Sequence, residues 1–281
     1  MIRNLMVIGG DQRMRMLTKL LTNEGYTVNE LGTDKGDGGE ERISQADALL
    51  FPYPFAVKED RVPTMNDEVI SPRWVLERAK PGIPVLAGKG LDAYITEMTS
   101  SSKPFVLRHY MDDPIFAQRN ADISAEAAVY ELMKRSRCML DEETVLVLGY
   151  GLFGRAIARI LKAFHTEVWV VARREKQRMQ AVSDGMQAFD IGWIDQLAPR
   201  VDAVLNTVPA VLLDEALLGR FSADVLLLEL ASPPYGMDLS AAAKMNLSAT
   251  VLPSLPSRYA PLSAARALKD ASMRLMMEGS L

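Results

Sequence analysis

Short apolar runs alternate with longer segments of helical periodicity along the whole chain. The runs that predict strands are 5–8, 26–31, 47–51, 83–87, 105–107, 144–148, 167–171, 203–205, 225–230 and 249–252. Strands that alternate with helices build parallel sheets from βαβ units. We therefore expect an α/β fold with two doubly wound parallel-sheet, Rossmann-like domains and a cleft between them, where ligands commonly bind.

Two helical segments predict how these domains are joined. Over 124–136 the apolar residues fall on one stripe, and Ser124 is a plausible N-cap. This helix is expected to carry the chain from an N-terminal α/β domain, residues 1–122, into a dinucleotide-binding domain, residues 123–258. A last helix within residues 259–281 is expected to pack back on the N-terminal domain.

The most specific local pattern is a glycine motif between a strand and a helix. The strand 144–148 runs into Gly149, Tyr150, Gly151, Leu152, Phe153 and Gly154, and helical periodicity follows. Gly149 allows a tight turn, Gly151 allows the pyrophosphate to approach, and Gly154 lets the helix pack near the strand. The helix N-terminus then offers unpaired N–H groups to the phosphates. The motif predicts a nicotinamide dinucleotide site.

The end of the next strand indicates which nicotinamide cofactor binds. An NAD site usually has an acidic residue there for the ribose hydroxyls, whereas this chain continues with Ala172, Arg173 and Arg174. A guanidinium suits a 2′-phosphate, so NADP is favoured. The alternative is that the arginines begin a solvated helix and that Glu175 binds the ribose of NAD.

Two later strand ends carry polar residues and prolines. Asn206, Thr207, Val208 and Pro209 follow one strand, and the segment 229–233, which includes Ser232, follows the next. The carboxyl ends of parallel strands are where doubly wound sheets bind ligands, so these segments are expected to shape a nicotinamide pocket. Each is, taken singly, also an ordinary turn.

Composition excludes several classes of protein. The net charge of −4 argues against a nucleic-acid or anionic-membrane binder, and no apolar run has the length of a membrane span. One cysteine, Cys138, and two histidines are too few for a disulfide framework or a zinc site. A strand begins almost at Met1, which leaves no room for a signal peptide. We expect a cytoplasmic protein without a metal.

An ordered set of short motifs resembles the family of dipicolinate synthase A subunits. The resemblance covers essentially the whole chain, and its motifs are Gly9-Gly10-Asp11-x-Arg13, Asn120-x-x-x-Ser124-Ala125-Glu126, Gly149-Tyr150-Gly151-x-x-Gly154, Asn206-Thr207-x-Pro209, Ala231-Ser232-Pro233 and Pro253-x-Leu255-Pro256. It implies an NAD(P)-dependent enzyme of sporulation that makes pyridine-2,6-dicarboxylate from an intermediate of lysine biosynthesis. It also implies a second, flavoprotein-like subunit.

The sequence departs from that family at three glycine positions or segments. The family has glycine where this chain has Ala127, glycine-rich sequence where it has 234–238, and glycines where it has Ser254 and Ser257. Serine in place of glycine is expected to change backbone angles beside the substrate loop. These departures put the exact substrate in question.

The implied substrate has two carboxylates and therefore needs cationic partners. The candidates near predicted strand ends or the interdomain loop are Arg13, Arg108 and Arg258, with His109 as a candidate general base and Ser232 as a further polar residue. The alternative for His109, which the pattern favours, is a surface histidine at the end of a strand. Two other functions remain open: a dehydrogenase of another small carboxylate, such as a 2-hydroxy or amino acid, and a non-catalytic nucleotide-binding regulatory subunit. We expect a homo-oligomer.

Overall fold

The computed structural model describes residues 2–33, 40–54, 60–65, 68–100 and 103–277. The chain forms two compact units. Unit 1 consists of Met1–Asn120 together with Pro256–Leu281, and unit 2 consists of Ala121–Leu255. The chain therefore enters unit 2 once and returns to unit 1 for its last segment. The sequence pattern places the two boundaries after residues 122 and 258 instead.

Unit 1 is built on a parallel sheet that is buried on both faces. Its strands are β1 (Asn4–Ile8), β2 (Thr27–Leu31), β3 (Ala48–Leu50), β4 (Pro84–Ala87) and β5 (Val106–His109). They lie in the order β2-β1-β3-β4-β5 and all pair in parallel. Leu5 and Leu50 point to one face and Met6 and Leu49 to the other, all fully buried. Such two-sided burial explains why the strands are apolar throughout.

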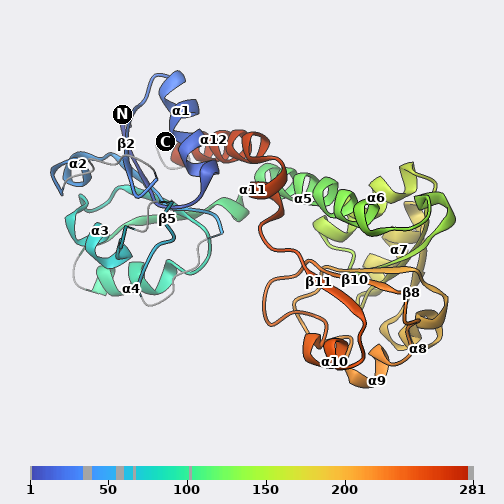
Figure 1. The fold of residues 1–281 in the computed structure, drawn as a ribbon. Helices are drawn as coiled ribbons and strands as arrows, with labels where there is room; N and C mark the ends of the chain where they lie inside the picture. Colours follow the sequence, from blue (N-terminus) through green and yellow to red (C-terminus); the bar gives the residue numbers. More distant parts are fainter. Residues whose placement is uncertain (1, 34–39, 55–59, 66–67, 101–102, 278–281) are drawn as a thin grey trace. The chain divides into compact units, whose positions relative to one another are not determined.

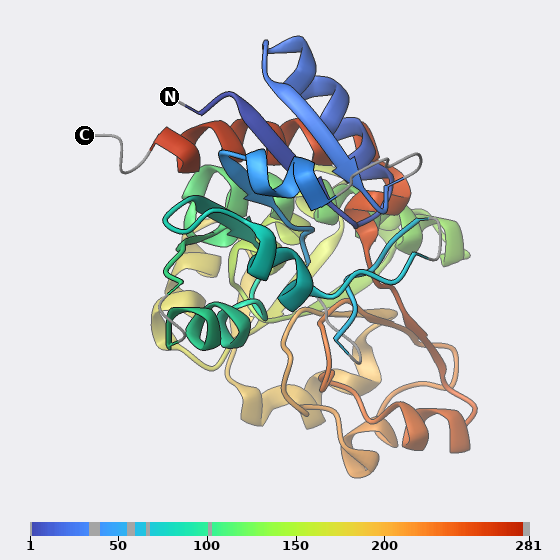
Figure 2. The same ribbon diagram turned by 90° about the vertical axis from the view of Figure 1, so that its left-hand side faces the viewer.

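Helices cover both faces of this sheet. They are α1 (Gln12–Asn23), α2 (Glu40–Gln45), α3 (Pro72–Arg78), α4 (Asp92–Ser100), α11 (Leu255–Tyr259) and α12 (Pro261–Met277). Figures 1 and 2 both show α12 beside α1. Leu268 and Leu275 of α12 join Leu17 and Leu21 of α1 in one apolar cluster. The expectation that the last helix packs on the first domain is thereby confirmed.

Unit 2 has a parallel sheet of six strands. They are β6 (Thr144–Leu148), β7 (Glu167–Val171), β8 (Gln187–Phe189), β9 (Ala203–Asn206), β10 (Leu226–Glu229) and β11 (Ser248–Val251). The order is β11-β10-β9-β6-β7-β8, so the direction of winding reverses between β6 and β9. This is the order of a dinucleotide-binding Rossmann sheet, in which ligands bind at the carboxyl ends beside the reversal. The predicted fold class is confirmed for both units.

The helices of unit 2 lie on both sides of its sheet. They are α6 (Leu152–Ala163), α7 (Glu175–Ser183), α8 (Ile194–Leu197), α9 (Glu215–Leu218) and α10 (Leu239–Lys244), together with most of α5 (Pro114–Arg135). In Figure 1, α6 lies on one side of the strands, and α9 and α10 lie on the other. No helix among the described residues combines the length and the apolar character that a membrane span requires.

The helix predicted over 124–136 begins ten residues earlier than expected. Helix α5 starts at Pro114, and Ser124 lies buried inside it rather than at its N-cap. Asp113 accepts hydrogen bonds from the backbone N–H groups of Ile115 and Phe116 and so caps the helix. Proline at the first helical position has no N–H to satisfy, which suits this start. The prediction of Ser124 as the N-cap was wrong.

Candidate functional site

A pocket of about 580 Å³ opens at the point where the winding of the unit 2 sheet reverses. Its walls come from the β6–α6 turn, the β7–α7 turn and the segment after β9. The volume is in the range of small-molecule and cofactor sites. The lining residues are Gly149, Tyr150, Gly151, Leu152, Phe153, Gly154, Val171, Ala172, Arg173, Arg174, Gln177, Ile191, Thr207, Val208, Pro209, Ala210 and Leu212.

The glycine turn is shaped by close contacts that exclude side chains. Gly149 has a φ of 91°, and a Cβ there would lie 2.6 Å from the Thr207 hydroxyl. A Cβ on Gly154 would lie 2.1 Å from the carbonyl oxygen of Gly149. A Cβ on Gly151, by contrast, would meet nothing within 4 Å. Gly151 is therefore not required by packing, and the space above it is open to a ligand.

The N-terminus of α6 faces this open space without a side-chain cap. Gly151 is the N-cap residue and has no side chain to accept hydrogen bonds from the first N–H groups of the helix. Unpaired N–H groups and the helix dipole together favour a bound anion. The turn and the open pocket thus fit the pyrophosphate of a dinucleotide.

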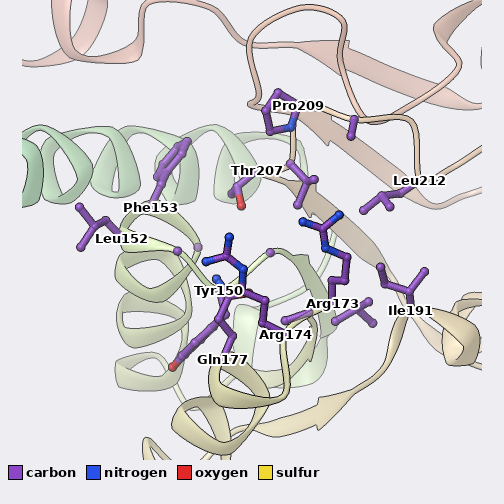
Figure 3. Close-up of a pocket in the computed structure, with 17 residues that line it drawn as sticks. Tyr150, Leu152, Phe153, Arg173, Arg174, Gln177, Ile191, Thr207, Pro209 and Leu212 are labelled. Atoms are coloured by element: carbon purple, nitrogen blue, oxygen red, sulfur yellow. The ribbon is translucent and has the colours of Figure 1, made fainter. Parts of the chain in front are cut away.

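Arginines line the side of the pocket that follows β7. Figure 3 shows the guanidinium groups of Arg173 and Arg174 extending from the β7–α7 turn toward the side where Thr207 lies. None of the described residues that line the pocket is acidic. Nη1 of Arg178 donates to the carbonyl oxygens of Ala172 and Arg173, both at 2.9 Å, and braces this turn. The turn therefore presents positive charge on a fixed backbone.

Tyr150 anchors the glycine turn to the end of α7. Its hydroxyl donates to Oδ2 of Asp184 at 2.9 Å, and Nε of Arg155 lies 2.9 Å from the same oxygen. Burial, together with the neighbouring Asp184 carboxylate, raises the pKa of Tyr150. Burial would raise the pKa of Asp184 as well, but the hydrogen bonds from Tyr150 and Gln180 keep it below its usual value. At neutral pH this contact joins a neutral phenol to a charged carboxylate.

The predicted cofactor residues line this pocket with one exception. Asn206 is fully buried beneath the pocket wall and does not face the pocket. Five further lining residues were not predicted from the sequence: Val171, Gln177, Ile191, Ala210 and Leu212. Ile191 follows β8, a strand of only three residues that was not predicted, and Gln177 lies one turn into α7. These residues line the pocket because of how the turns fold, which a local sequence pattern does not show.

Arg13 already has a partner in unit 1. It is buried, its Nη2 lies 2.8 Å from Oδ2 of Asp11, and its Nε donates to both oxygens of that carboxylate. Asp11 also accepts from the backbone N–H of Arg13 and is the N-cap of α1. Burial would raise the pKa of Asp11, but the Arg13 guanidinium beside it holds that pKa below its usual value. The pairing makes Arg13 a weaker candidate for a substrate carboxylate.

His109 has a carboxylate partner on one ring nitrogen. Its Nε2 lies 2.9 Å from Oδ1 of Asp92, and its side chain is 15% exposed. The other ring nitrogen, Nδ1, is enclosed and has no hydrogen-bond partner among the described residues. The Asp92 carboxylate can orient the imidazole ring, as a partner of a general base does. The role of general base that was predicted for His109 stays a hypothesis.

The other predicted catalytic residues are dispersed. Arg108 is half-buried at the end of β5, whereas Arg258 is exposed and lies over the ring of Tyr259 at 5.3 Å. The segment that holds Arg258 reaches the start of α1, because Gln12 donates to the carbonyl oxygen of Ser257. Within unit 1, β1 and β5 are separated by three strand spacings, about 14 Å, so the candidates form two groups. Ser232 is exposed in unit 2, after β10.

Two of the residues that differ from the resembled family have a backbone conformation that suits glycine. Ser254 has a φ of 55°, and Tyr235, in the segment where that family is glycine-rich, has a φ of 65°. Residues with a Cβ adopt this left-handed region at a cost. Ser257 is buried, and its side chain hydrogen-bonds Asp11. We expected serine to change the backbone angles at position 254. Ser254 instead adopts the left-handed conformation that suits glycine, at a cost in energy.

Comparison with known proteins agrees with this geometry. Residues 4–106 match the family model for the N-terminal domain of the dipicolinate synthase A subunit, and residues 117–231 match the NAD-binding domain of D-isomer specific 2-hydroxyacid dehydrogenases. The dipicolinate synthase A subunit of Bacillus subtilis is 26% identical over 97% of this chain and 95% of its own length.

Solved structures extend the match to three dimensions. The crystal structure of the dipicolinate synthase A subunit from Bacillus halodurans has a TM-score of 0.87 at 25% identity, covering 98% of this chain and 97% of its own. D-lactate dehydrogenase with NAD+ from Lactobacillus jensenii has a TM-score of 0.64 at 12% identity and covers 96% of this chain and 94% of its own, which shows a shared fold. In sequence and in structure the chain is thus similar to dipicolinate synthase A subunits over 97–98% of its length, and its residues 117–231 match an NAD-binding domain of the dehydrogenase type.

Proposed function

We propose that this protein is an NADP-dependent oxidoreductase that converts a dihydrodipicolinate-type dicarboxylate into pyridine-2,6-dicarboxylate. The observation that carries the proposal is the pocket at the reversal of the unit 2 sheet, with an open helix N-terminus at one end and two arginines at the other. The similarity of the whole chain to the dipicolinate synthase A subunits supports this substrate.

The preference for NADP rests on the charges around the β7–α7 turn. Arg173 and Arg174 line the pocket, whereas Glu175 does not, although it directly follows them. Asp190, another acidic residue near this end, is paired with Arg178 at 2.9 Å. A 2′-phosphate would therefore meet positive charge without a competing carboxylate, and a guanidinium offers it two parallel donors.

The chain's residues bind and orient the reactants in this proposal. When bound, the nicotinamide would supply a hydride acceptor for oxidation of the dihydropyridine ring, which also loses a proton, and aromatisation of the product would supply the driving force. The N–H groups at the start of α6 bind the pyrophosphate. Leu152, Phe153, Pro209 and Leu212 give the pocket apolar walls. Such positioning accounts for a large part of the rate when the reaction is itself favourable.

The substrate's carboxylates need cations, and unit 1 offers them. We assign this role first to Arg258, which is exposed, and to Arg108, which is half-buried, because Arg13 is neutralised by Asp11. His109 is the proposed proton acceptor. Because Asp92 holds its Nε2, the nitrogen that would accept the proton is the enclosed Nδ1, which has no hydrogen-bond partner among the described residues. The proposal is completed by a cytoplasmic location, a role in sporulation, a homo-oligomeric state and a flavoprotein-like second subunit.

The test supplies purified protein with dihydrodipicolinate and either NADP or NAD. Ultraviolet absorbance follows the aromatic product, nicotinamide absorbance follows the cofactor, and parallel reactions contain the proposed second subunit. We expect equal amounts of pyridine dicarboxylate and NADPH, with full activity only when the second subunit is present. The proposal fails if no pyridine dicarboxylate forms in either reaction while the chain alone oxidises another carboxylate.

A further inference from the structure

A buried carboxyl group lies at the end of β10, directly behind the pocket wall. Glu229 is fully buried, and its side chain accepts four hydrogen bonds. Oε1 accepts from Nδ2 of Asn206 at 2.7 Å and from the backbone N–H of Ala231 at 2.9 Å. Oε2 accepts from the N–H groups of Gly236 at 2.9 Å and Met237 at 3.0 Å. All four partners donate hydrogen bonds, which matches a carboxylate, a group that can only accept them.

Asn206 connects this carboxyl group to the pocket wall. Its Nδ2 also donates to the carbonyl oxygen of Val208 at 3.0 Å, and its Oδ1 accepts from the N–H of Val208 at 3.1 Å. Because Glu229 can only accept, the amide nitrogen of Asn206 must face it, and this fixes the orientation of Oδ1 toward Val208. Val208 itself lines the pocket.

The loop after β10 closes on the same group. A Cβ on Gly236 would lie 2.2 Å from Nδ2 of Asn206 and 2.6 Å from the carbonyl oxygen of Val208. The carbonyl oxygen of Gly236 accepts from the N–H groups of Leu212 and Leu213 at 2.9 and 3.0 Å. Glu229, Asn206 and Gly236 therefore join the loops after β9 and β10 into one body, which we call the β9–β10 clamp.

We propose that Glu229 and Asn206 are positioning residues for the nicotinamide half of the cofactor. This inference rests on the proposed function. A dinucleotide crosses the sheet where the winding reverses, with one mononucleotide half on each side. The arginines after β7 mark the adenosine side, so the nicotinamide half lies against the segment after β9. The clamp holds that segment, Thr207 to Leu212, and touches neither arginine.

A purely structural role would give a different pattern of binding. If the four hydrogen bonds only stabilised unit 2, their loss would lower its stability and weaken both halves of the site together. A positioning role predicts a selective effect instead, in which the adenosine half binds normally and the nicotinamide half does not. Separate ligands for the two halves therefore distinguish the two roles.

The experiment measures binding of 2′,5′-ADP, which represents the adenosine half, and of NADPH by calorimetry. Asn206→Ala removes the link to Val208 and leaves Glu229 its three backbone donors. Glu229→Gln places an NH₂ group against two N–H donors. Asp202→Ala is the matched control, because Asp202 accepts from the N–H of Thr144 at the opposite end of β9. The fluorescence of bound NADPH reports the surroundings of the nicotinamide ring.

Both clamp variants are expected to bind 2′,5′-ADP like the wild type and NADPH about tenfold more weakly, the effect of one unpaired buried group. The change in NADPH emission on binding should also be reduced, and the control should match the wild type. Equal weakening of both ligands, or unchanged binding of both, would overturn the positioning role. If Glu229→Gln does not fold, Asn206→Ala decides alone. A wild-type protein that binds neither ligand contradicts the proposed function instead.

Discussion

The first strand of each unit leads into the same turn–helix arrangement, and the two units use it in opposite ways. In unit 1 the N-cap of α1 is Asp11, with φ −106° and ψ −169°, and in unit 2 the N-cap of α6 is Gly151, with φ −80° and ψ −167°. The backbone conformation is nearly the same. The Asp11 carboxylate takes the place at the helix N-terminus that an anion would occupy, whereas Gly151 leaves it open.

One side chain thus separates a closed turn from an open turn on the same fold. In unit 1 the carboxylate, its partner Arg13 and the contact from Gln12 to Ser257 make the turn part of the core. In unit 2 the helix N-terminus has no partner among the described residues that caps it through a side chain. Function therefore follows from the site and not from the fold.

The largest expected effect comes from filling the open turn. Gly151→Val places a branched side chain where the pyrophosphate lies, and it should weaken NADPH binding by at least about a hundredfold, or about 2.8 kcal/mol. The variant should remain folded, because a Cβ at Gly151 meets nothing within 4 Å. Gly219→Val, in the same unit and away from the pocket, is the control. Calorimetric titration and circular dichroism of both variants check this.

The next effect in size concerns the positive charge on the β7–α7 turn, which should favour NADPH over NADH. Arg173→Ala is expected to cost about 1.5–3 kcal/mol of NADPH affinity and much less of NADH affinity, because a charged hydrogen bond to the 2′-phosphate is lost. Arg220→Ala removes the same charge from an exposed pair with Asp195 and should change neither. Equal affinity of the wild type for both cofactors in these titrations would contradict the assignment of NADP.

Removing the Asp11 carboxylate, which closes the turn before α1, should lower the stability of the fold and leave NADPH binding unchanged. Asp11→Ala takes away the N-cap of α1 and leaves the buried Arg13 without its partner, at a cost of about 1–3 kcal/mol. Asp238→Ala removes an N-cap that accepts from Ala241 but pairs with no arginine among the described residues, so it should cost less. Scanning calorimetry gives the stabilities. A loss of NADPH affinity in Asp11→Ala would show that unit 1 contributes to the cofactor site.

The smallest expected effect is a dependence of unit 1 stability on pH. Burial alone would raise the pKa of Asp11, but its interactions with Arg13 lower it. A carboxyl group with a lowered pKa stabilises the fold above about pH 4, and this contribution is lost as the pH falls through the folded-state pKa. The stability difference between wild type and Asp11→Asn should therefore shrink in acid. The change should stay below about 1 kcal/mol, because the Asp11 side chain is 39% exposed.

For that measurement, the free energies of unfolding of both proteins are compared at neutral pH and at successively lower pH. A difference that stays constant through the acid range would mean that Asp11 acts through packing and not through its charge.

Local patterns predicted which residues line the pocket better than they predicted a cluster of catalytic side chains. The turn around Gly151 is contiguous in sequence. Gly149 and Gly154 each have a steric reason of their own, whereas Gly151 leaves the space above it open. The roles of Arg13 and His109 depend on Asp11 and Asp92, whose contacts belong to the folded chain. Position near a strand end identified both residues but did not show that each side chain already has a carboxylate partner.

Two further differences have a local physical cause. The start of α5 was missed although Asp113 and Pro114 form a capping signal, because the apolar stripe farther along the helix suggested a later start. Glu229 was seen only as part of a segment after a strand. A charged residue that directly ends an apolar run carries a signal of its own, since such a group must find donors in the folded protein.

The most direct test of the central claim transplants the cap of unit 1 into unit 2. Gly151→Asp should place a carboxylate at the N-terminus of α6, as Asp11 does at α1, on a backbone of nearly the same conformation. Calorimetric titration with NADPH should show one binding site per wild-type chain and none in the variant. The Tm of the variant without cofactor should equal or exceed that of the wild type, because aspartate caps a helix at least as well as glycine. NADPH binding by a folded Gly151→Asp variant with wild-type affinity would contradict the account.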